Sequence, residues 1–587
     1  MAGAVGGLGL PIRDPARDPA ATRPSASALD PITMAMHLHG SFSEGAGSME
    51  AHLSEARRLG VDVLWWTDHD FRVAAHGYRK AVRFDGPEEY EGSLWWRWEE
   101  RRGGPLGPAK GTFVDDPHSP DEPGRALRLS AKGTAEDWGE LTFLGSAWNR
   151  TYTTSVADTS LELDVLVESV GTNAEFLTEL VLSHHPAAAD RPAGQYRLRY
   201  VLNGAASRSR RAEGLLGVVE LPAPRGRWHR LTLPLVEDLR ALWPDMVAED
   251  NALTEVRLAV RARRGATARA VADRLRFRRG GRDGDGGLAL HRETIRRLAE
   301  RFPDQRQCES LEVSLVRHLN WFGETVTMPD FDGPPVKDNS VAAAAEMVRL
   351  IHRNGGLASY NHPLPGGADA GGRLGRHLVE TRALGCEIVE IGCGQNLGSL
   401  LQAFDISARN AVFFTATGVT DDHSGLDWLR QDANYLTGVW ARSARIPDLL
   451  DALRAGRAWF VDPLGWRGEL DLSVGDREGA MGGVLVASAR TQQVRIVATD
   501  LPRDGVLEIV SGPVDLGGPS AATETRTVPA GKVRGGGYDL RVQPGAGRYL
   551  RVQVRDASGE IVGVGNPVWL LREEPPAGVP SERLLLG

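Results

Sequence analysis

The 587-residue chain lacks the features of a membrane protein, a disulfide scaffold or a nucleic-acid-binding protein. No run of about 18 apolar residues occurs, so no membrane span is expected. Only three cysteines are present, and Cys308, Cys386 and Cys393 form no zinc-finger or CxxC spacing. The formal net charge is −8 and the arginines are scattered among acidic residues, so nucleic acid is not an expected partner.

The first 30 residues also lack the basic segment and long apolar centre of a signal peptide. Their Pro, Ala and Gly content predicts a disordered tail, and a second tail is expected over residues 576–587. The compartment is therefore left open between cytoplasmic and exported, and the sequence does not indicate an oligomeric state.

The pattern of the remaining chain predicts a multidomain protein of α/β and β regions. Over residues 31–78 a strand, a helix ending at Gly60 and a second strand form the βαβ unit of a parallel sheet, and the pattern resumes over residues 287–462. Between them, residues 79–286 alternate apolar and polar side chains with period two, which predicts an inserted, jelly-roll-like β-sandwich. The same alternation over residues 463–575 predicts a C-terminal β-sandwich.

The stretch MAMHLHG, at 34–40, carries two histidines in a strand-like run. Side chains alternate between the two faces of a strand, so His37 and His39 point the same way. Such a pair either binds a metal ion or faces water, and an isolated pair is more often of the second kind. Whether this pair binds a metal ion therefore depends on the other candidate ligands in the chain.

Other imidazoles and carboxylates follow the carboxyl ends of further predicted strands. The candidate ligands collected in this way are His37, His39, Asp68, His69, His362, Asp421 and His423. In barrel-like α/β folds this rim is where loops converge and active sites lie. Mixed imidazole and carboxylate ligands suit Zn, Mn or Fe, so the sequence predicts a metal site at this rim.

These motifs resemble those of the polymerase-and-histidinol-phosphatase (PHP) superfamily of metallohydrolases. The chain has HLHGSFSEG for the opening HxH motif, TDHD at 67–70 for the second, NHP at 361–363 for the third and TDDHS for the final DxH. The resemblance covers about residues 31–77 and 288–462. It implies a distorted (β/α)7 barrel, here split by the inserted β-sandwich.

Within the superfamily the chain is most similar to the branch of CehA/McbA type, which carries a Glu-Val strand followed by a GHxN turn. The stretch LEVSLVRHLNWFG matches this pattern with Glu312 and His318, although its spacing is one residue short and Glu309 is a rival for the glutamate. Glu44 stands where the family usually has Asp or His.

The resemblance implies two to three divalent metal ions. One ion would be held by His37, His39, Glu312 and Asp421. A second would be held by Glu44, His69 and His423, and a third by His318 and His362 with Glu312 as a bridge. Clustered ions of this kind lower the pKa of a bridging water and neutralise charge that develops on a substrate.

Three aspartates beside the expected ligands are candidates for catalytic roles. Asp68 and Asp70 flank His69 and either orient it or cap a turn. Asp422 either transfers a proton or serves as a turn residue.

Two further stretches are assigned outside the metal site. His184 and His185, next to Pro186, are interpreted as surface loop residues. The glycine-rich segment 363–377 is either a mobile lid, with Arg373 or Arg376 available to an anionic substrate, or a flexible connector.

These observations lead us to expect a metal-dependent hydrolase that uses a metal-bridging hydroxide. A phosphoesterase is the leading expectation, and a carboxyl-ester, carbamate or amide hydrolase is its rival, because such a hydroxide attacks phosphorus or a carbonyl carbon. The expected partner is a small-molecule or glycan-linked ester. From a different class, the chain would be a glycan- or partner-binding protein with a structural metal site.

Overall fold

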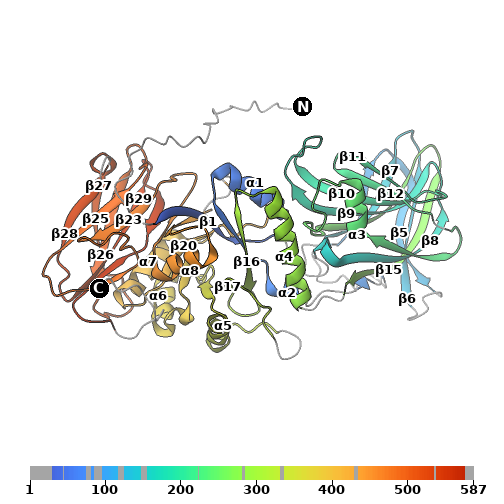
Figure 1. The fold of residues 1–587 in the computed structure, drawn as a ribbon. Coiled ribbons are helices and arrows are strands. Elements are labelled where there is room, and N and C mark those ends of the chain that lie inside the picture. Colours follow the sequence, from blue (N-terminus) through green and yellow to red (C-terminus); the bar gives the residue numbers. More distant parts are fainter. Residues whose placement is uncertain are drawn as a thin grey trace.

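The computed structural model of the protein describes most of the chain. The described residues are 29–43, 45–74, 81–82, 84, 96–116, 124–146, 155–222, 224–280, 284–330, 336–428, 434–533 and 537–575. Both predicted tails lie outside them, apart from residues 29 and 30. The fold is mostly β-sheet with few helices, and the predicted β-sandwich content is confirmed. The inserted region and the C-terminal region lie at opposite ends of the molecule, with the α/β region between them (Figure 1).

The central region contains two sets of parallel strands in one sheet. Its strands, in spatial order, are β20 (Thr415–Gly418), β19 (Ile388–Gly392), β18 (Leu357–Tyr360), β17 (Leu319–Phe322), β16 (Arg306–Val313), β2 (Val63–Trp66), β1 (Asp30–Leu38), β21 (Leu436–Ala441) and β22 (Ala458–Val461). Strands β1, β2 and β16 run parallel, as do β18, β19 and β20, and β17 joins the two sets by antiparallel pairing.

This sheet curls back on itself. The Thr437 hydroxyl on β21 accepts from the backbone N–H of Gly418 on β20 and donates to the Gly418 carbonyl. These bonds join two strands that lie far apart in the order of the sheet. The curl brings the carboxyl ends of both parallel sets to one rim.

Helices join and cover the central strands. They are α1 (Met49–Leu59), α2 (Asp70–Val73), α4 (Gly284–Arg301), α5 (Val341–Arg353), α6 (Ala370–Thr381), α7 (Leu397–Arg409) and α8 (Ile446–Ala455). Helix α1 begins where the Ser48 side chain accepts from the Ala51 N–H and ends at Gly60, whose φ of 72° suits glycine. Helices α1 and α4 lie on the side of the central region that faces the inserted region (Figure 1).

The glycine-rich segment 363–377 is not a lid or connector throughout, because α6 begins at Ala370. A Cβ atom at Gly375 would lie 2.6 Å from the Ile406 side chain, and one at Gly371 would lie 2.5 Å from Gln402, both on α7. The glycines therefore allow α6 and α7 to pack closely, and the sequence pattern was wrongly interpreted as flexibility there.

The inserted region consists of two sheets and the helix α3 (Leu235–Leu242). One sheet has the order β11 (Ser209–Glu213), β12 (Leu216–Glu220), β10 (Gly194–Leu202), β9 (Ala174–His185), β14 (Glu255–Ala262), β7 (Gly139–Ser146) and β4 (Trp96–Gly103). The other has the order β13 (Trp228–Pro234), β8 (Thr159–Ser169), β15 (Thr267–Arg279), β6 (Gly124–Gly133) and β5 (Leu106–Asp116), with β3 (Ala81–Val82) beside β15. Buried side chains of the inserted region form a core that is distinct from that of the central region.

The C-terminal region continues the central sheet. Strand β22 pairs with β30 (Ile561–Gly565), which is followed in the sheet by β29 (Gly547–Arg555), β26 (Val506–Pro513) and β27 (Glu524–Pro529). Strands β24 (Val484–Val486) and β31 (Val568–Leu571) join it beside β29, and a second sheet consists of β23 (Leu470–Val474), β25 (Gln492–Ala498) and β28 (Tyr538–Val542). The apolar core of the central region extends without a break into this region.

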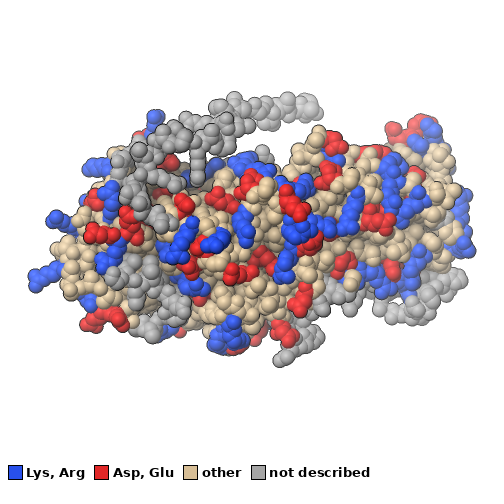
Figure 2. All heavy atoms as spheres, viewed as in Figure 1, with Lys and Arg blue, Asp and Glu red and all other residues tan. Residues whose placement is uncertain are grey.

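Charged side chains of both signs are mixed on the surface, as the scattered arginines of the sequence predict. Figure 2 shows Lys and Arg side chains interspersed with Asp and Glu over the visible face. Among the described residues, no helix is long and apolar enough to cross a membrane.

Candidate metal centre

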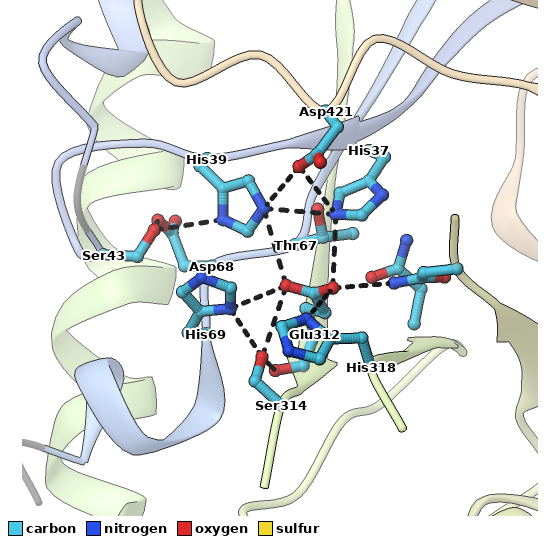
Figure 3. A network of polar contacts seen from close by, with 12 residues as sticks. His37, His39, Ser43, Thr67, Asp68, His69, Glu312, Ser314, His318 and Asp421 are labelled. Carbon is cyan, nitrogen blue, oxygen red and sulfur yellow. Dashed lines mark hydrogen bonds and ion pairs between the residues drawn. The ribbon is translucent and has the colours of Figure 1, made fainter. Parts of the chain in front are cut away.

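Side chains from several strand ends converge at the rim of the central sheet, and Figure 3 shows His37, His39, His69, Glu312, His318 and Asp421 among them. The structure brings together eight of the nine ligands that the resemblance implies, namely His37, His39, His69, Glu312, His318, His362, Asp421 and His423. The ninth, Glu44, lies outside the described residues. Strands β1, β2, β16, β18 and β20 lead into these positions, so residues almost 390 positions apart become neighbours.

Glu312, on β16, occupies the middle of the cluster and is 1% exposed. Its Oε2 lies 2.6 Å from Nδ1 of His69, and its Oε1 lies 2.9 Å from Nδ1 of His318. The Nε2 atoms of His37 and His39 each lie 3.6 Å from a Glu312 oxygen. One carboxylate is thus surrounded by imidazoles, with His362 Nε2 at 3.5 Å.

His37 and His39 turn their Nε2 atoms toward each other at 3.1 Å. The same Asp421 oxygen lies 3.3 Å from one of these nitrogens and 3.2 Å from the other. The ring of His423 stacks on that of His39, with 4.1 Å between centroids. Two nitrogens at this distance share at most one proton between them, whereas both are able to coordinate a cation.

Neighbouring groups hold the other nitrogen of three of these imidazoles. Glu390 Oε1 lies 2.8 Å from His37 Nδ1, which donates to it. The Ser43 hydroxyl donates to Asp68 and therefore accepts from His39 Nδ1 at 3.2 Å. His423 Nδ1 likewise donates to the backbone carbonyl of Asp421 at 3.0 Å. With Nδ1 held in this way, each ring would offer Nε2 to a metal ion once that nitrogen carries no proton.

The donor set fits divalent cations. Three groups have ligand atoms within 4.8 Å of one another, and they consist of His39, His69 and His423, of His37, His39 and Asp421, and of His69, Glu312 and His318. Because His39 and His69 each belong to two groups, ions held by them would be adjacent. Imidazole nitrogens with carboxylate oxygens suit Zn, Mn or Fe.

The protonation of the cluster follows from its burial and charge. Burial disfavours the carboxylate form, but His69 and His37 hold the pKa of Glu312 well below its usual range. Burial and the neighbouring imidazoles of His423 and His69 lower the pKa of His39 to about 4. Burial also acts on His37, but there Glu390 and Asp421 outweigh it and raise the pKa well above its usual value.

Three of the candidate ligands have a strained backbone. The φ angles are 49° at His318, 28° at His362 and 50° at Asp421, all in the region that side chains other than glycine rarely adopt. Such strain costs on the order of 1–3 kcal/mol per residue and clusters at functional sites. Here it coincides with the residues that bring nitrogen and oxygen ligands to the cluster.

The predicted catalytic aspartates have supporting positions. Asp68 is fully buried and accepts from the Gly40 N–H, the Ser43 hydroxyl and Nε2 of His291. It therefore orients a candidate ligand, but that ligand is His39, through Ser43, and no described contact joins it to the flanking His69.

Asp70 and Asp422 lie beside the cluster. Asp70 is the first residue of α2 and accepts from the Ser314 N–H, and burial raises its pKa to about 6. Asp422 accepts from the Ser424 hydroxyl, the Gly425 N–H and Nε1 of Trp428. These contacts favour the turn role of Asp422 over proton transfer.

The structure also separates the two rival glutamates, Glu309 and Glu312, and places Glu390, which no motif indicated, beside the cluster. Glu309 pairs with Arg292 on α4, away from the cluster that surrounds Glu312. Glu390, on β19, accepts from His37 and from the His362 backbone N–H, and is 1% exposed. An acid in the middle of the apolar stretch IVEIG was the available signal.

No family model matches the chain, and no curated protein matches it either. Among solved structures it is similar to a family 11 carbohydrate-binding module from Clostridium thermocellum (14% identity, 34% of this chain and 95% of that one, TM-score 0.19). It is also similar to SGBP-B from Bacteroides uniformis (15%, 34% and 49%, TM-score 0.20) and to the Humicola grisea Cel12A catalytic domain (10%, 30% and 87%, TM-score 0.20). Likenesses this weak carry no argument about ligand or activity.

Proposed function

We propose that the cluster around Glu312 binds two to three divalent metal ions and that the protein is a metal-dependent hydrolase. The observation that carries the proposal is the convergence of eight imidazole and carboxylate side chains, with the buried carboxylate of Glu312 in their middle. A structural zinc site is usually closed by four ligands, so this number exceeds what stabilisation requires.

The arrangement of strands supports a PHP-type barrel. Two parallel sets in a curled sheet deliver the ligands from strand ends, and the motifs follow one another along the chain in the order of that superfamily. We therefore interpret the central region as the distorted (β/α)7 barrel that the motifs resemble, interrupted by the inserted region.

The protein's own residues have definable roles in such a reaction. When bound, divalent cations lower the pKa of a coordinated water and stabilise negative charge on the substrate. Glu390 and Ser43 hold the rings of His37 and His39 with Nε2 directed inward. Asp421 is 36% exposed, so it lies on the side of the cluster that a substrate approaches.

A fixed positive charge favours an anionic substrate. The ammonium group of the exposed Lys337 lies 3.2 Å from Nε2 of His318. The bond from Asp338 N–H to the Leu315 carbonyl holds this segment beside the cluster. A phosphoester carries the charge that such an ammonium group attracts, and phosphoester hydrolysis is therefore the proposed reaction.

Metal analysis of protein purified without chelator tests the proposal. We expect two to three ions per chain in the wild type and a clear loss in His39→Ala, with little unfolding. His229→Ala, on β13 of the inserted region, is the matched control and should retain the wild-type metal content. A wild-type protein without bound ions, even after incubation with Zn²⁺ or Mn²⁺, would contradict the metal centre.

Activity assays separate the reaction classes. Hydrolysis of p-nitrophenyl phosphate, with a raised KM in Lys337→Gln, is the expected result. Hydrolysis of p-nitrophenyl acetate alone would favour the carboxyl-ester, carbamate or amide class. Full metal occupancy without activity over a broad panel of esters would favour a binding protein with a structural metal site.

A further inference from the structure

The inserted region contacts the loop that carries His39. The described residues of this loop, which follows β1, are 39–43 and 45–48. Asp250 of the inserted region is fully buried against it. Its carboxylate accepts from the Ser41 hydroxyl at 2.8 Å and from the Met49 and Glu50 N–H groups at 2.8 and 2.9 Å. One side chain thus joins the loop to the first turn of α1.

The end of β9 binds the same loop through its backbone. The His184 N–H donates to the Ala46 carbonyl at 2.7 Å, and the Ser48 N–H donates to the His184 carbonyl at 2.9 Å. His185 is 2% exposed and lies 3.3 Å from a Glu50 oxygen. The interpretation of His184 and His185 as surface loop residues was therefore wrong, because this junction buries His185.

The loop in turn contacts a second candidate ligand. The Gly47 N–H donates to the His423 carbonyl at 3.0 Å. A Cβ atom at Gly47 would collide with the Ser424 carbonyl, so the two segments approach as closely as glycine allows. A continuous set of contacts therefore leads from the inserted region, through the loop, to His39 and His423.

We infer that the inserted region is part of the metal centre, and that Asp250 is a positioning residue that sets its metal affinity. The inference rests on the proposed metal centre. Among the described residues, Asp250 touches no candidate ligand itself. It stabilises the loop conformation in which His39 and His423 face each other, because its buried carboxylate satisfies three donors that the loop and α1 would otherwise leave unpaired.

Zn²⁺ titration of the full-length protein against a chromophoric chelator tests this role. In Asp250→Asn the amide nitrogen cannot accept, so at least one of the three bonds is lost. We expect Zn²⁺ affinity to fall about tenfold, at the lower end of the effect of groups that support metal ligands. Ser41→Ala removes only the hydroxyl bond to Asp250, and we expect a smaller loss of about threefold.

Glu249→Gln is the matched control. Glu249 adjoins Asp250 and pairs with Arg297 across the same junction, but no described contact joins it to the loop. Its affinity for Zn²⁺ should remain within twofold of wild type. Circular dichroism of each variant in chelator shows whether it is folded before the titration, and a role confined to stability would change the unfolding transition but not the Zn²⁺ affinity of the folded protein.

The outcomes separate this inference from the proposed function. Wild-type protein that binds Zn²⁺, together with unchanged affinity in folded Asp250→Asn and Ser41→Ala, would overturn the role of the inserted region alone. An equal loss in Glu249→Gln would overturn it as well, since it would assign the effect to the junction as a whole. Wild-type protein that binds no Zn²⁺ would overturn both proposals.

Discussion

The inserted and C-terminal regions are both β-rich, but they are attached to the central region in different ways. The C-terminal region extends the central sheet through the pairing of β22 with β30 and shares its apolar core. The inserted region has its own sheets and its own core. Its junction includes the polar side chains of Asp250, His185 and Glu249, besides Val247, which packs in the central core.

This difference in attachment indicates that one junction is needed for folding and the other for the candidate metal centre. Burial of apolar surface is the dominant favourable contribution to folding, so a region that shares a core cannot be removed without exposing it. Directional hydrogen bonds contribute less to stability but define where groups lie. The C-terminal region therefore stabilises the fold, whereas the inserted region positions a loop of the candidate metal centre.

Deletion tests give the largest expected effect. Removal of residues 463–587 would leave β22 without β30 and expose the shared core. We therefore expect the truncated protein to lose cooperative unfolding and to bind a hydrophobic dye. Residues 79–286 expressed alone should instead unfold cooperatively, because their core is complete. Thermal unfolding followed by near-UV circular dichroism measures both. A truncated protein that melts like the full-length chain would contradict the comparison.

Asp405→Ala removes one partner of a buried pair at the C-terminal junction. Asp405 on α7 binds Arg551 on β29 with distances of 2.8 and 2.9 Å, and both are under 10% exposed. The uncompensated arginine is expected to lower the free energy of unfolding by about 3–5 kcal/mol in urea denaturation.

Asp515→Ala is the control at the same junction. Asp515 pairs with Arg409 of α7, but its side chain is 43% exposed, so a loss below about 1 kcal/mol is expected. Equal effects of the two substitutions would contradict the importance of burial at this junction.

A buried ion pair on α4 predicts a pH effect. His291 donates to Asp68, and although burial opposes the charged form, Asp68 and Glu309 raise the pKa of His291 to about 9. Its protonation therefore stabilises the fold below the unfolded pKa of about 6.5, and this stabilisation is lost as the pH rises through 9. Relative to His291→Gln, the metal-free wild type should lose about 3 kcal/mol across this range.

Urea denaturation in chelator at intervals between pH 6 and 10 measures this difference. A difference between wild type and His291→Gln that does not change with pH would contradict a charged histidine. Since α4 returns the chain from the inserted region to the central sheet, the result would also show that one contact near this junction is strongly stabilising.

Glu249→Gln has the smallest expected effect on stability. Its partners Arg297 and Arg240 are 37% and 52% exposed, and ion pairs of this kind contribute about 0–1 kcal/mol. The free energy of unfolding should fall by less than about 1 kcal/mol, and the difference should shrink in high salt. A loss comparable to that of Asp405→Ala would show that the two junctions are energetically alike.

Parts of the site were accessible from the sequence because they depend on local pattern. The HxH pair on β1 points to one face since strand side chains alternate, and the Asp and His residues that follow strands were recognisable by position. The same alternation places Glu309 and Glu312, three residues apart, on opposite faces of β16. Which face is turned inward depends on the neighbouring strands and α4, so the sequence left the choice open.

Other parts depended on contacts between distant segments. Glu390 lies 353 residues from His37, and no spacing along the chain relates them. The close packing of α6 on α7 could be predicted only if Ile406 were known to lie opposite Gly375. Without that contact, a glycine-rich stretch resembles a flexible one. The continuity of the central and C-terminal sheets likewise depends on the pairing of β22 with β30.

The types of the candidate ligands, the alternation of side chains along strands and the ends of helices such as α1 could be read from the sequence alone, because these follow from the properties of residues and their near neighbours. The folded structure was needed to see that the candidate ligands surround Glu312, that His39 Nδ1 turns toward Ser43, and that Asp250 binds the loop of His39. These depend on hydrogen bonds and packing between segments that meet only in the folded chain.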